Sequence, residues 1–411
     1  MKVCFLAPEL YPIWGGGGAY AIGLLRYLPK KVDVHVLTMR RNVPESKEDS
    51  SEEIIPGFFG NNVHVHFITS GSDTFFCHAK FQYQCYRWVL KLHEKYGFDV
   101  IHSQHQPMSD ILLKFLSKKL CYVTTVHETF SRRDEAIRNS KTGFSELEFS
   151  EKWMLILSPF LELVESFYMK KSPKLISPSN WMKNVLNEDF NFPLSDIYVV
   201  NNGVDHNKFH PKAKKSEFIQ KVRDEAGGPI VLFSGRMIST KGVQVLVEAI
   251  PKIIREIKDA YFIFVGGGNS EPYRQNLKKL GIPNKNYNFL GYIPNFDDMP
   301  GLYSIASIFV APTLYENFPI RILENMSCQN AVVATDIVGI PEMIENQVNG
   351  LLIDPWDVNA LSENVIKLLN DRALAKKIGQ NARKTVEEKF TLQKFSNKTV
   401  EVYEKVLNDT I

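Results

Sequence analysis

Residues 309–354 of the chain read FVAPTLYENFPIRILENMSCQNAVVATDIVGIPEMIENQVNGLLID. The apolar run over 308–311 predicts a buried strand, and a polar turn follows it. The next residues have helical spacing, and two further buried strands are predicted at 331–335 and 350–353. Strand, loop, helix and strand in this order form the unit of a parallel sheet, which binds ligands at the carboxyl ends of its strands.

Two glutamates stand at special places in this unit. Glu316 comes just before the predicted helix, in whose first turn Pro319 fits because its missing N–H costs no hydrogen bond. Glu324 falls about a turn and a half inside that helix. Two carboxylates so placed can face one crevice and accept hydrogen bonds from the hydroxyls of a polyol. Taken alone, however, such a pair is more often a helix cap and a solvated side chain.

The wider pattern favours a functional role for the pair. The spacing E-x7-E, followed by AVVATD and GIPE, strongly resembles the retaining nucleotide-sugar glycosyltransferases of the GT-B fold, glycosyltransferase family four. The resemblance implies an α/β protein of two Rossmann-like domains with a deep cleft between them. It further implies an N-terminal acceptor-side domain at 1–205, a nucleotide-sugar domain at 206–385 and a helix at 386–411 that crosses back to the first domain.

The bulk properties of the chain agree with a two-domain protein. A chain of 411 residues is longer than one that folds around a single ordinary core. Its 49 basic and 46 acidic residues give a net charge of only +3, which argues against nucleic acid as the ligand. The sequence has no apolar run of about 18 residues and no secretory leader pattern. Five cysteines without C-x-x-C spacing indicate a reduced, cytoplasmic compartment. No motif of metal ligands appears, so we expect neither a metal nor another cofactor.

The glycine run 15–18 follows the first predicted strand and precedes an apolar-periodic helix. Glycine lets a backbone approach a ligand closely, and the N–H groups of the following helix attract an anion. The alternative is a simple flexible turn. By resemblance to the family, Gly16 and Gly17 would face the donor phosphate and sugar.

Two predicted strands, 99–102 and 122–127, end in histidine, which places each imidazole at the carboxyl edge of the sheet. A single histidine at this place is more often structural than catalytic. VTTVHE resembles the family strand that ends beside the donor sugar, so His127 is our candidate sugar contact. His102 and His105 are weaker candidates.

The stretch GRMISTKG follows a predicted strand at 229–234 and presents Arg236 and Lys241 beside a helix N-terminus. Arginine matches phosphate oxygens with a planar fork and lysine adds a mobile charge, so the pair predicts a diphosphate site. Two cations on a loop are usually only solvated, but the G-R-x4-K-G frame closely resembles the diphosphate site of the family. The resemblance adds further donor contacts at Asn202, Gly235, Gly266, Tyr292, Ile293, Asn317, Phe318, Pro319 and Ile320.

The region 146–171 is predicted to be helical and contains WMLILSPFLELVESFYMKK. Such a helix more often packs on its own domain, and the alternative is a peripheral contact with the inner face of a membrane. The loops at 40–62 and 128–150 would belong to the acceptor side.

We therefore expect transfer of a hexose from a UDP-sugar or GDP-mannose type donor to a sugar, lipid or small-molecule acceptor with retention of configuration. Arg236 and Lys241 would stabilise the leaving diphosphate, Glu316 the sugar hydroxyls and Glu324 the ribose hydroxyls. The sequence departs from the family at Asn317 and Pro319, where many members have glycines, and at Gln329 and Asn330 before the second strand. A non-catalytic nucleotide-sugar-binding scaffold, or an epimerase or hydrolase of nucleotide sugars on the same fold, stays open as an alternative.

Overall fold

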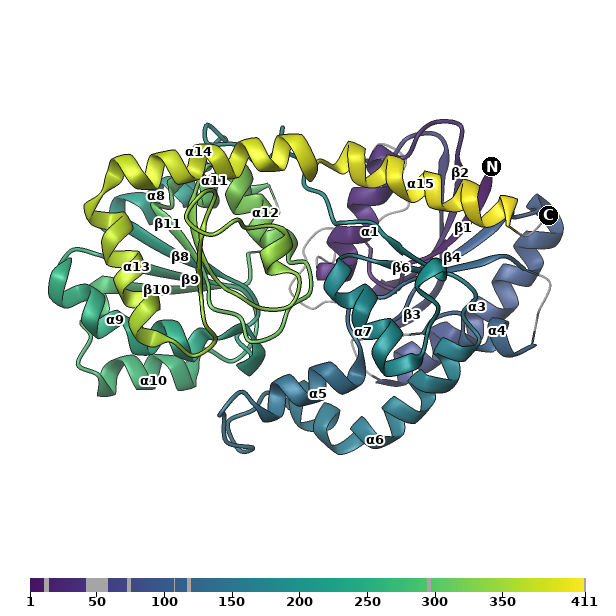
Figure 1. Ribbon diagram of the computed structural model, residues 1–411, viewed down its shortest axis with the longest axis horizontal. Coiled ribbons are helices and arrows are strands. Elements are labelled where there is room, and N and C mark those ends of the chain that lie inside the picture. The colour runs from purple at the N-terminus through teal and green to yellow at the C-terminus, as the bar shows by residue number, and fades with distance from the viewer. Residues whose placement is uncertain are drawn as a thin grey trace. The chain divides into compact units, whose positions relative to one another are not determined.

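The computed structural model describes residues 1–10, 15–41, 58–71, 75–106, 108–116, 120–293 and 297–409. These residues fall into two compact units, each built on a parallel sheet (Figure 1). The first unit comprises 1–129, 162–203 and 392–411, and the second comprises 130–161 and 204–391. Most of the loop expected at 40–62 lies outside the described residues.

The first unit has a seven-stranded sheet in the order β3-β2-β1-β4-β5-β6-β7. Its strands are β1 (Lys2–Leu6), β2 (Asp33–Arg41), β3 (Val63–Gly71), β4 (Val100–Gln104), β5 (Tyr122–Thr125), β6 (Leu175–Ser177) and β7 (Ile197–Val199). Its helices are α1 (Gly16–Tyr27), α3 (Phe75–Tyr96), α4 (Ile111–Leu116), α7 (Asn180–Phe190) and α15 (Leu392–Asn408), with a short 3-10 turn at Leu194–Asp196. The helix α6 (Phe149–Lys170) begins in the second unit and continues into the first.

The second unit has a six-stranded sheet in the order β10-β9-β8-β11-β12-β13. Its strands are β8 (Ile230–Ser234), β9 (Tyr261–Val265), β10 (Tyr287–Gly291), β11 (Ile308–Ala311), β12 (Ala331–Thr335) and β13 (Leu351–Ile353). Its helices are α5 (Phe130–Arg138), α8 (Glu217–Ala226), α9 (Val243–Glu256), α10 (Glu271–Lys279), α11 (Asp298–Ile305), α12 (Ile320–Ser327), α13 (Val358–Asn370) and α14 (Arg372–Lys389). Short 3-10 turns occur at Ser239–Lys241, Asn284–Asn286 and Ile340–Glu342.

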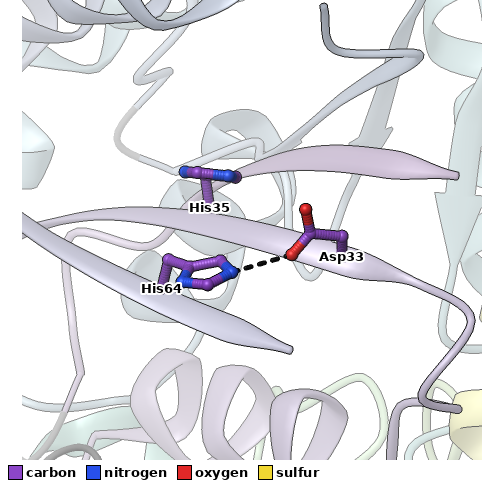
Figure 2. A group of neighbouring side chains, drawn as sticks. All are labelled: Asp33, His35 and His64. Carbon is purple, nitrogen blue, oxygen red and sulfur yellow. Dashed lines mark hydrogen bonds and ion pairs between the residues drawn. The ribbon is translucent and has the colours of Figure 1, made fainter. Parts of the chain in front are cut away.

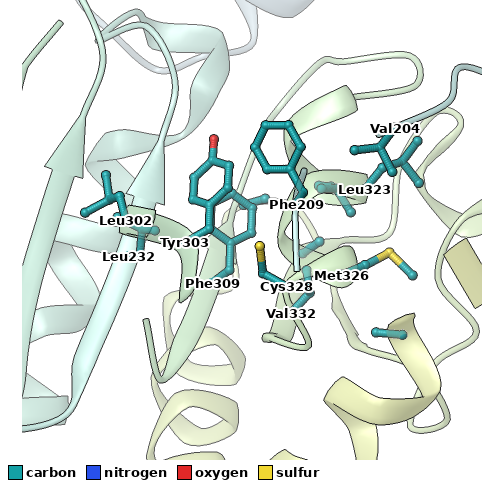
Figure 3. Packing of buried hydrophobic residues seen from close by; sticks show 14 of the residues in the cluster. Val204, Phe209, Leu232, Leu302, Tyr303, Phe309, Leu323, Met326, Cys328 and Val332 are labelled. Atoms are coloured by element: carbon teal, nitrogen blue, oxygen red, sulfur yellow. The ribbon is translucent and has the colours of Figure 1, made fainter. Parts of the chain in front are cut away.

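Alternation along the strands gives the second sheet two covered faces. On β8, Leu232 belongs to a core with α8, α11 and α12, whereas Val231 and Phe233 belong to a core with α9, α10 and α13. Figure 3 shows the first of these cores, in which Tyr303 and Phe309 pack beside strand and helix residues. Each large apolar side chain buried there stabilises the fold by roughly 1.5–3 kcal/mol. Helices on both faces explain why these strands read as continuous apolar runs.

The unit boundaries differ from the expected domains by two residues at the first crossing, which lies after Gly203, and by more in two other places. Residues 130–161 group with the second unit, whereas we expected them in the first domain, because they contact the loop that follows β8. The chain returns to the first unit at Leu392 rather than at residue 386, since α14 runs on to Lys389 and packs on α12 and β12.

Candidate active site

Several of the residues predicted to contact a donor lie where the strand order of the second sheet reverses, between β8 and β11. Open parallel sheets bind ligands outside the carboxyl ends of their strands at such a point. The loop after β8 and the loop after β11 are joined there, because Leu314 N–H and Thr313 Oγ1 donate hydrogen bonds of 2.8 and 3.0 Å to Thr240 O. Gly242, at φ 69°, lies so close to Pro312 O that a side chain would clash, which fixes glycine at the start of α9.

Glu316 lies between two cations on this edge. Its Oε1 is 2.9 Å from Lys241 Nζ, and its Oε2 is 2.6 Å from Arg321 Nη2. Burial opposes ionisation of the carboxyl, but Arg321 and Lys241 outweigh it and hold the pKa of Glu316 below its ordinary value. The group is therefore a fixed carboxylate at neutral pH. A carboxylate has about four lone-pair sites, so two remain for hydroxyl donors.

Arg321, which sequence analysis did not single out, holds this arrangement together. Its Nη1 donates a 2.5 Å hydrogen bond to Ser234 O, and its guanidinium lies 5.7 Å from the centroid of the Phe233 ring. A side chain at Gly235 would meet Arg321 Nη1, so the glycine makes room for the guanidinium. The signal was an arginine five residues after Glu316, in the first turn of the helix that follows it.

Arg236 and Lys241 are held by different carboxylates. Arg236 Nη2 is 2.7 Å from Glu148 Oε2, and its side chain is 52% exposed, whereas Lys241 is bound to Glu316. The loop between them is further held by Glu151, whose Oε1 accepts hydrogen bonds from Ser239 N–H at 3.1 Å and Ser239 Oγ at 2.6 Å. Sequence reasoning missed both glutamates because they lie about 90 positions earlier in the chain.

Glu324 is 7% exposed on α12, deep in the second unit. Burial raises the pKa of its carboxyl to about 7, although a hydrogen bond with the Tyr303 hydroxyl and the charges of Lys208 and Arg321 oppose this rise. The Tyr303 hydroxyl also lies 2.9 Å from Ser234 Oγ, at the end of β8. Through Tyr303, Glu324 is thus linked to the end of β8, where Arg321 also contacts Ser234.

The remaining predicted donor contacts of the second unit have varied surroundings. Phe318 is buried and packs edge-to-face on Phe390 at 5.5 Å, which gives it a core role in addition to any contact with a donor. Tyr292 is 48% exposed, and Ile293 packs against the core. The others lie in turns or at the helix start: Gly266 donates its N–H to Gly291 O, Asn317 is buried, Pro319 is the N-cap of α12 and Ile320 is its first residue.

The glycine run of the first unit is part of a helix rather than a loop before one. α1 begins at Gly16, so Gly16 and Gly17 form its first turn, with Gly15 as the N-cap. Gly17 O accepts a 3.5 Å hydrogen bond from Gln104 Nε2, at the end of β4. This sheet also reverses its order between β1 and β4, so the helix N-terminus stands at a predicted ligand edge.

His127 lies two residues beyond β5 rather than at its last position. Burial, followed by the charge of His105, lowers its pKa to about 4, so the imidazole is neutral at pH 7. Its ring packs edge-to-face on Tyr20 at 4.6 Å. A neutral imidazole can donate one hydrogen bond and accept another, as a sugar contact requires.

The other polar residues of this sheet edge have structural partners. His102 is fully buried within β4 and bonds to the hydroxyls of Thr125, at 2.8 Å, and Tyr403, at 2.5 Å. His105 Nε2 is 3.0 Å from Glu165 Oε1, and both side chains are buried. Asn202 is also buried, at 6% exposure.

Comparison with known proteins agrees with this architecture. A model of glycosyltransferase family 4 matches residues 14–208, and a model of glycosyl transferases group 1 matches residues 214–385. The chain belongs to glycosyltransferase family four. The crystal structure of Anabaena HepE in complex with UDP-glucose matches 98% of this chain and 100% of that chain with a TM-score of 0.73 at 18% identity, which supports the GT-B fold.

Two curated relatives of this glycosyltransferase cover most of its length. An uncharacterized glycosyltransferase of Methanocaldococcus jannaschii is 27% identical over 419 residues, with 98% of each chain covered. The UDP-Gal:alpha-D-GlcNAc-diphosphoundecaprenol alpha-1,3-galactosyltransferase of Escherichia coli is 26% identical over 325 residues, covering 76% of this chain and 77% of that protein. Among the helices described in our glycosyltransferase, none is long and apolar enough to cross a membrane.

Proposed function

We propose that this glycosyltransferase moves a hexose from a nucleoside diphosphate sugar to a hydroxyl acceptor with retention of configuration. The observation that carries the proposal is the pairing of Lys241 and Arg321 around Glu316 at the β8/β11 edge. Two fixed cations and an ionised carboxylate at one strand edge suit a ligand that combines a diphosphate with a sugar. The donor named for the Escherichia coli relative, UDP-galactose, is of this class.

The barrier to transfer is dominated by negative charge that grows on the leaving diphosphate. Lys241 and Arg236 would stabilise this charge together with the N–H groups at the start of α9, so we propose transfer without a metal ion. Arg236 is half exposed and is held by Glu148 and Ser150, so phosphate oxygens can compete for its guanidinium.

The carboxylates would position the donor. Glu316 accepts hydrogen bonds from sugar hydroxyls through the lone pairs that Lys241 and Arg321 leave, and Glu324 accepts those of the ribose. His127, Gly16 and Gly17 of the first unit would contact the donor sugar and phosphate. In this proposal no protein group attacks the anomeric carbon. The acceptor oxygen forms the new bond on the face from which the diphosphate leaves. The diphosphate takes the bonding electron pair, and its leaving oxygen accepts the proton of the acceptor hydroxyl.

The test begins with donor binding. We expect one class among UDP-glucose, UDP-galactose, GDP-mannose and ADP-glucose to raise the melting temperature of the protein in EDTA. With that donor, Lys241→Ala and Arg236→Ala should each weaken binding at least roughly tenfold, the loss of a charge-assisted hydrogen bond. Lys252→Ala is the matched control, because Lys252 contacts the exposed side chain of Glu363 and Asn359 on the same unit, away from Lys241 and Arg236.

Release of nucleoside diphosphate with and without candidate acceptors then separates the alternatives. Acceptor-dependent release that is lost in Lys241→Ala supports transfer. Binding without any release would favour a scaffold, and acceptor-independent turnover would favour a hydrolase or epimerase. Unchanged turnover in both alanine variants would contradict the mechanism.

We also propose that α6 contacts a lipid surface, because its apolar stripe is exposed. We had expected the more common arrangement, in which such a stripe packs on its own domain. Six side chains recur every three or four residues along the helix, are 46–75% exposed and include three phenylalanines and a tryptophan: Phe149, Trp153, Ile156, Phe160, Leu163 and Phe167. Lys170 Nζ lies 5.9 Å from the Phe167 ring centroid, so a positive charge stands at the end of the apolar stripe. A lysine at this place can reach lipid headgroups while its methylene chain stays on apolar surface.

Sedimentation with phosphatidylglycerol vesicles tests this contact. Binding should be lost in the double variant Phe160→Ser, Leu163→Ser and kept in Leu280→Ser, an exposed leucine on the second unit. Equal binding of all three proteins would contradict the proposal. Loss of self-association in the double variant without vesicle binding would instead indicate a second copy of the chain on this stripe.

A further inference from the structure

Four ligand-type side chains lie together on one face of the first sheet. In the parallel pairing of β2 and β3, His35 is directly opposite His64. Asp33 and His66 lie two residues away along the two strands, and a spacing of two keeps a side chain on the same face. Strand pairing therefore collects these groups although the sequence shows only the short patterns DVH and HVH.

The contacts within this group are close. His64 Nε2 is 2.8 Å from Asp33 Oδ1, the contact drawn as a dashed line in Figure 2. His35 Nδ1 is 2.9 Å from His66 Nε2. One ligand atom each from Asp33, His35 and His64 lies within 4.8 Å of the others. His35 is buried, whereas the side chains of His64 and Asp33 are 45% and 38% exposed, so the group is rooted in the sheet and open to solvent on one side.

The charged groups near this cluster are of both signs. Lys2 acts on His35 and Lys95 on His66, and both lysines would repel a bound cation. The carboxylate of Asp33 would attract the cation and offset part of this repulsion.

We propose that Asp33, His35 and His64 bind a divalent transition-metal ion of the zinc class. Two imidazoles and a carboxylate are a recognised ligand set for zinc, and three protein ligands leave one position for water. Tetrahedral zinc with bonds of about 2.0–2.1 Å places its ligand atoms about 3.3 Å apart, so the exposed side chains of His64 and Asp33 must close on His35.

His66 would act as the orienting partner of this site. Its 2.9 Å hydrogen bond to Nδ1 of His35 fixes the ring, as hydrogen bonds from neighbouring groups do for metal-bound histidines. The site joins the edge strand β3 to β2 and shares no residue with the proposed transfer site. A bound ion would thus stabilise the first unit by favouring the native state in which its ligands meet. The sequence alone does not reveal this cluster, because its residues come from two strands with a long connection between them.

The test uses the full chain, which is first treated with EDTA to remove bound metal and then dialysed to remove the EDTA. We expect calorimetric titration with ZnCl₂ to give one site per chain, and CoCl₂ to give visible d–d absorption of a site with imidazole ligands. His64→Asn and Asp33→Asn, both at exposed side chains, should abolish the absorption and the zinc-induced rise in melting temperature. His206→Asn, a histidine of the second unit, should change neither.

A graded variant separates a metal site from a hydrogen-bonded histidine cluster. His66→Asn should weaken zinc binding roughly 10–100-fold without abolishing it. Equal zinc affinity in wild type, His64→Asn and Asp33→Asn, or no cobalt absorption in wild type, would overturn the proposal. Donor binding should be the same with and without zinc, so the outcome is independent of the proposed transfer activity.

Discussion

At the scale of single residues, the donor side is organised by ion pairs whose partners are far apart in sequence. Glu316 is ionised because Lys241 and Arg321 surround it, whereas Glu324, on the helix that follows, has a raised pKa because burial dominates. The two glutamates of one motif are thus placed in opposite electrostatic settings. Their roles as donor contacts stay predictions. Their different pKa values lead to two tests, one for each glutamate.

Arg321→Gln should raise the pKa of Glu316, because burial is the largest influence on that carboxyl and one of its two opposing cations is removed. The acidic limb of the pH profile of donor turnover should move upward by roughly 1–3 pH units. Donor turnover measured from pH 4.5 to 9 tests this, with Arg223→Gln on the exposed face of α8 as control. An unchanged profile would mean that Arg321 supports only the fold.

Glu324→Gln should change how stability depends on pH. The pKa of Glu324 in the folded protein, about 7, lies above the ordinary pKa of an unfolded glutamate. The contribution of Glu324 to stability is therefore greatest below the unfolded pKa and is lost as the pH rises through the folded pKa. The full loss is roughly 3 kcal/mol, and the glutamine variant should lack it.

Urea-unfolding midpoints at pH 5 and pH 8 provide the measurement. From pH 5 to pH 8, the urea midpoint of wild type should decrease relative to that of Glu324→Gln. The midpoint of Glu256→Gln, a change at an exposed helix end, should vary with pH as that of wild type does. If wild type and Glu324→Gln keep a constant difference in midpoint, the raised pKa is wrong.

At the scale of elements, the departure from the family at Gln329 and Asn330 has a structural role. Gln329 has φ 63° after α12, and two hydrogen bonds close the helix: Asn330 N–H to Asn325 O and Gln329 N–H to Met326 O. This is a Schellman motif with glutamine at the position that favours glycine. The Asn330 side chain donates to Tyr303 O and Asn325 Oδ1, so it ties the same turn to α11.

Gln329→Gly should therefore stabilise the second unit by about 0.5–1 kcal/mol. The left-handed conformation costs a non-glycine residue about 1–2 kcal/mol, and the greater entropy of glycine in the unfolded chain cancels part of the gain. Calorimetric melting checks this. Gln275→Gly, in the exposed interior of α10, is a control of opposite sign that should cost about 1 kcal/mol, and a loss of stability at both positions would contradict the strain argument.

At the scale of the whole molecule, the last helix completes the first unit although it comes after the second in sequence. α15 packs on α1, where Leu392 lies against Gly23 and Phe395 packs on Tyr20 at 5.0 Å. Tyr403 bonds to the buried His102 of β4. The first unit therefore needs the end of the chain to bury its core, whereas the last residue of the second unit is Thr391.

Removal of 392–411 should unfold the first unit and leave the second folded. Limited proteolysis followed by mass spectrometry should show rapid cleavage within 1–129 and a resistant fragment that contains 204–391. Glu404→Ala is the control, because its ion pair with Lys31 is exposed and contributes little. Equal resistance of both units after the deletion would show that α15 is dispensable.

The sequence by itself determined the parallel α/β class, most strand positions and the family, because these depend on local periodicity and on motifs whose residues are close together. It also placed Lys241 and Glu316 in loops after predicted strands, whose carboxyl ends share one edge of a parallel sheet. Only the tertiary structure decided that Arg236 pairs with Glu148, 88 positions away, that Arg321 holds Glu316 and that α6 exposes its apolar stripe. The same holds for the histidine cluster of β2 and β3. Contacts of this kind depend on which distant segments the fold brings together, and no periodicity in a single segment encodes them.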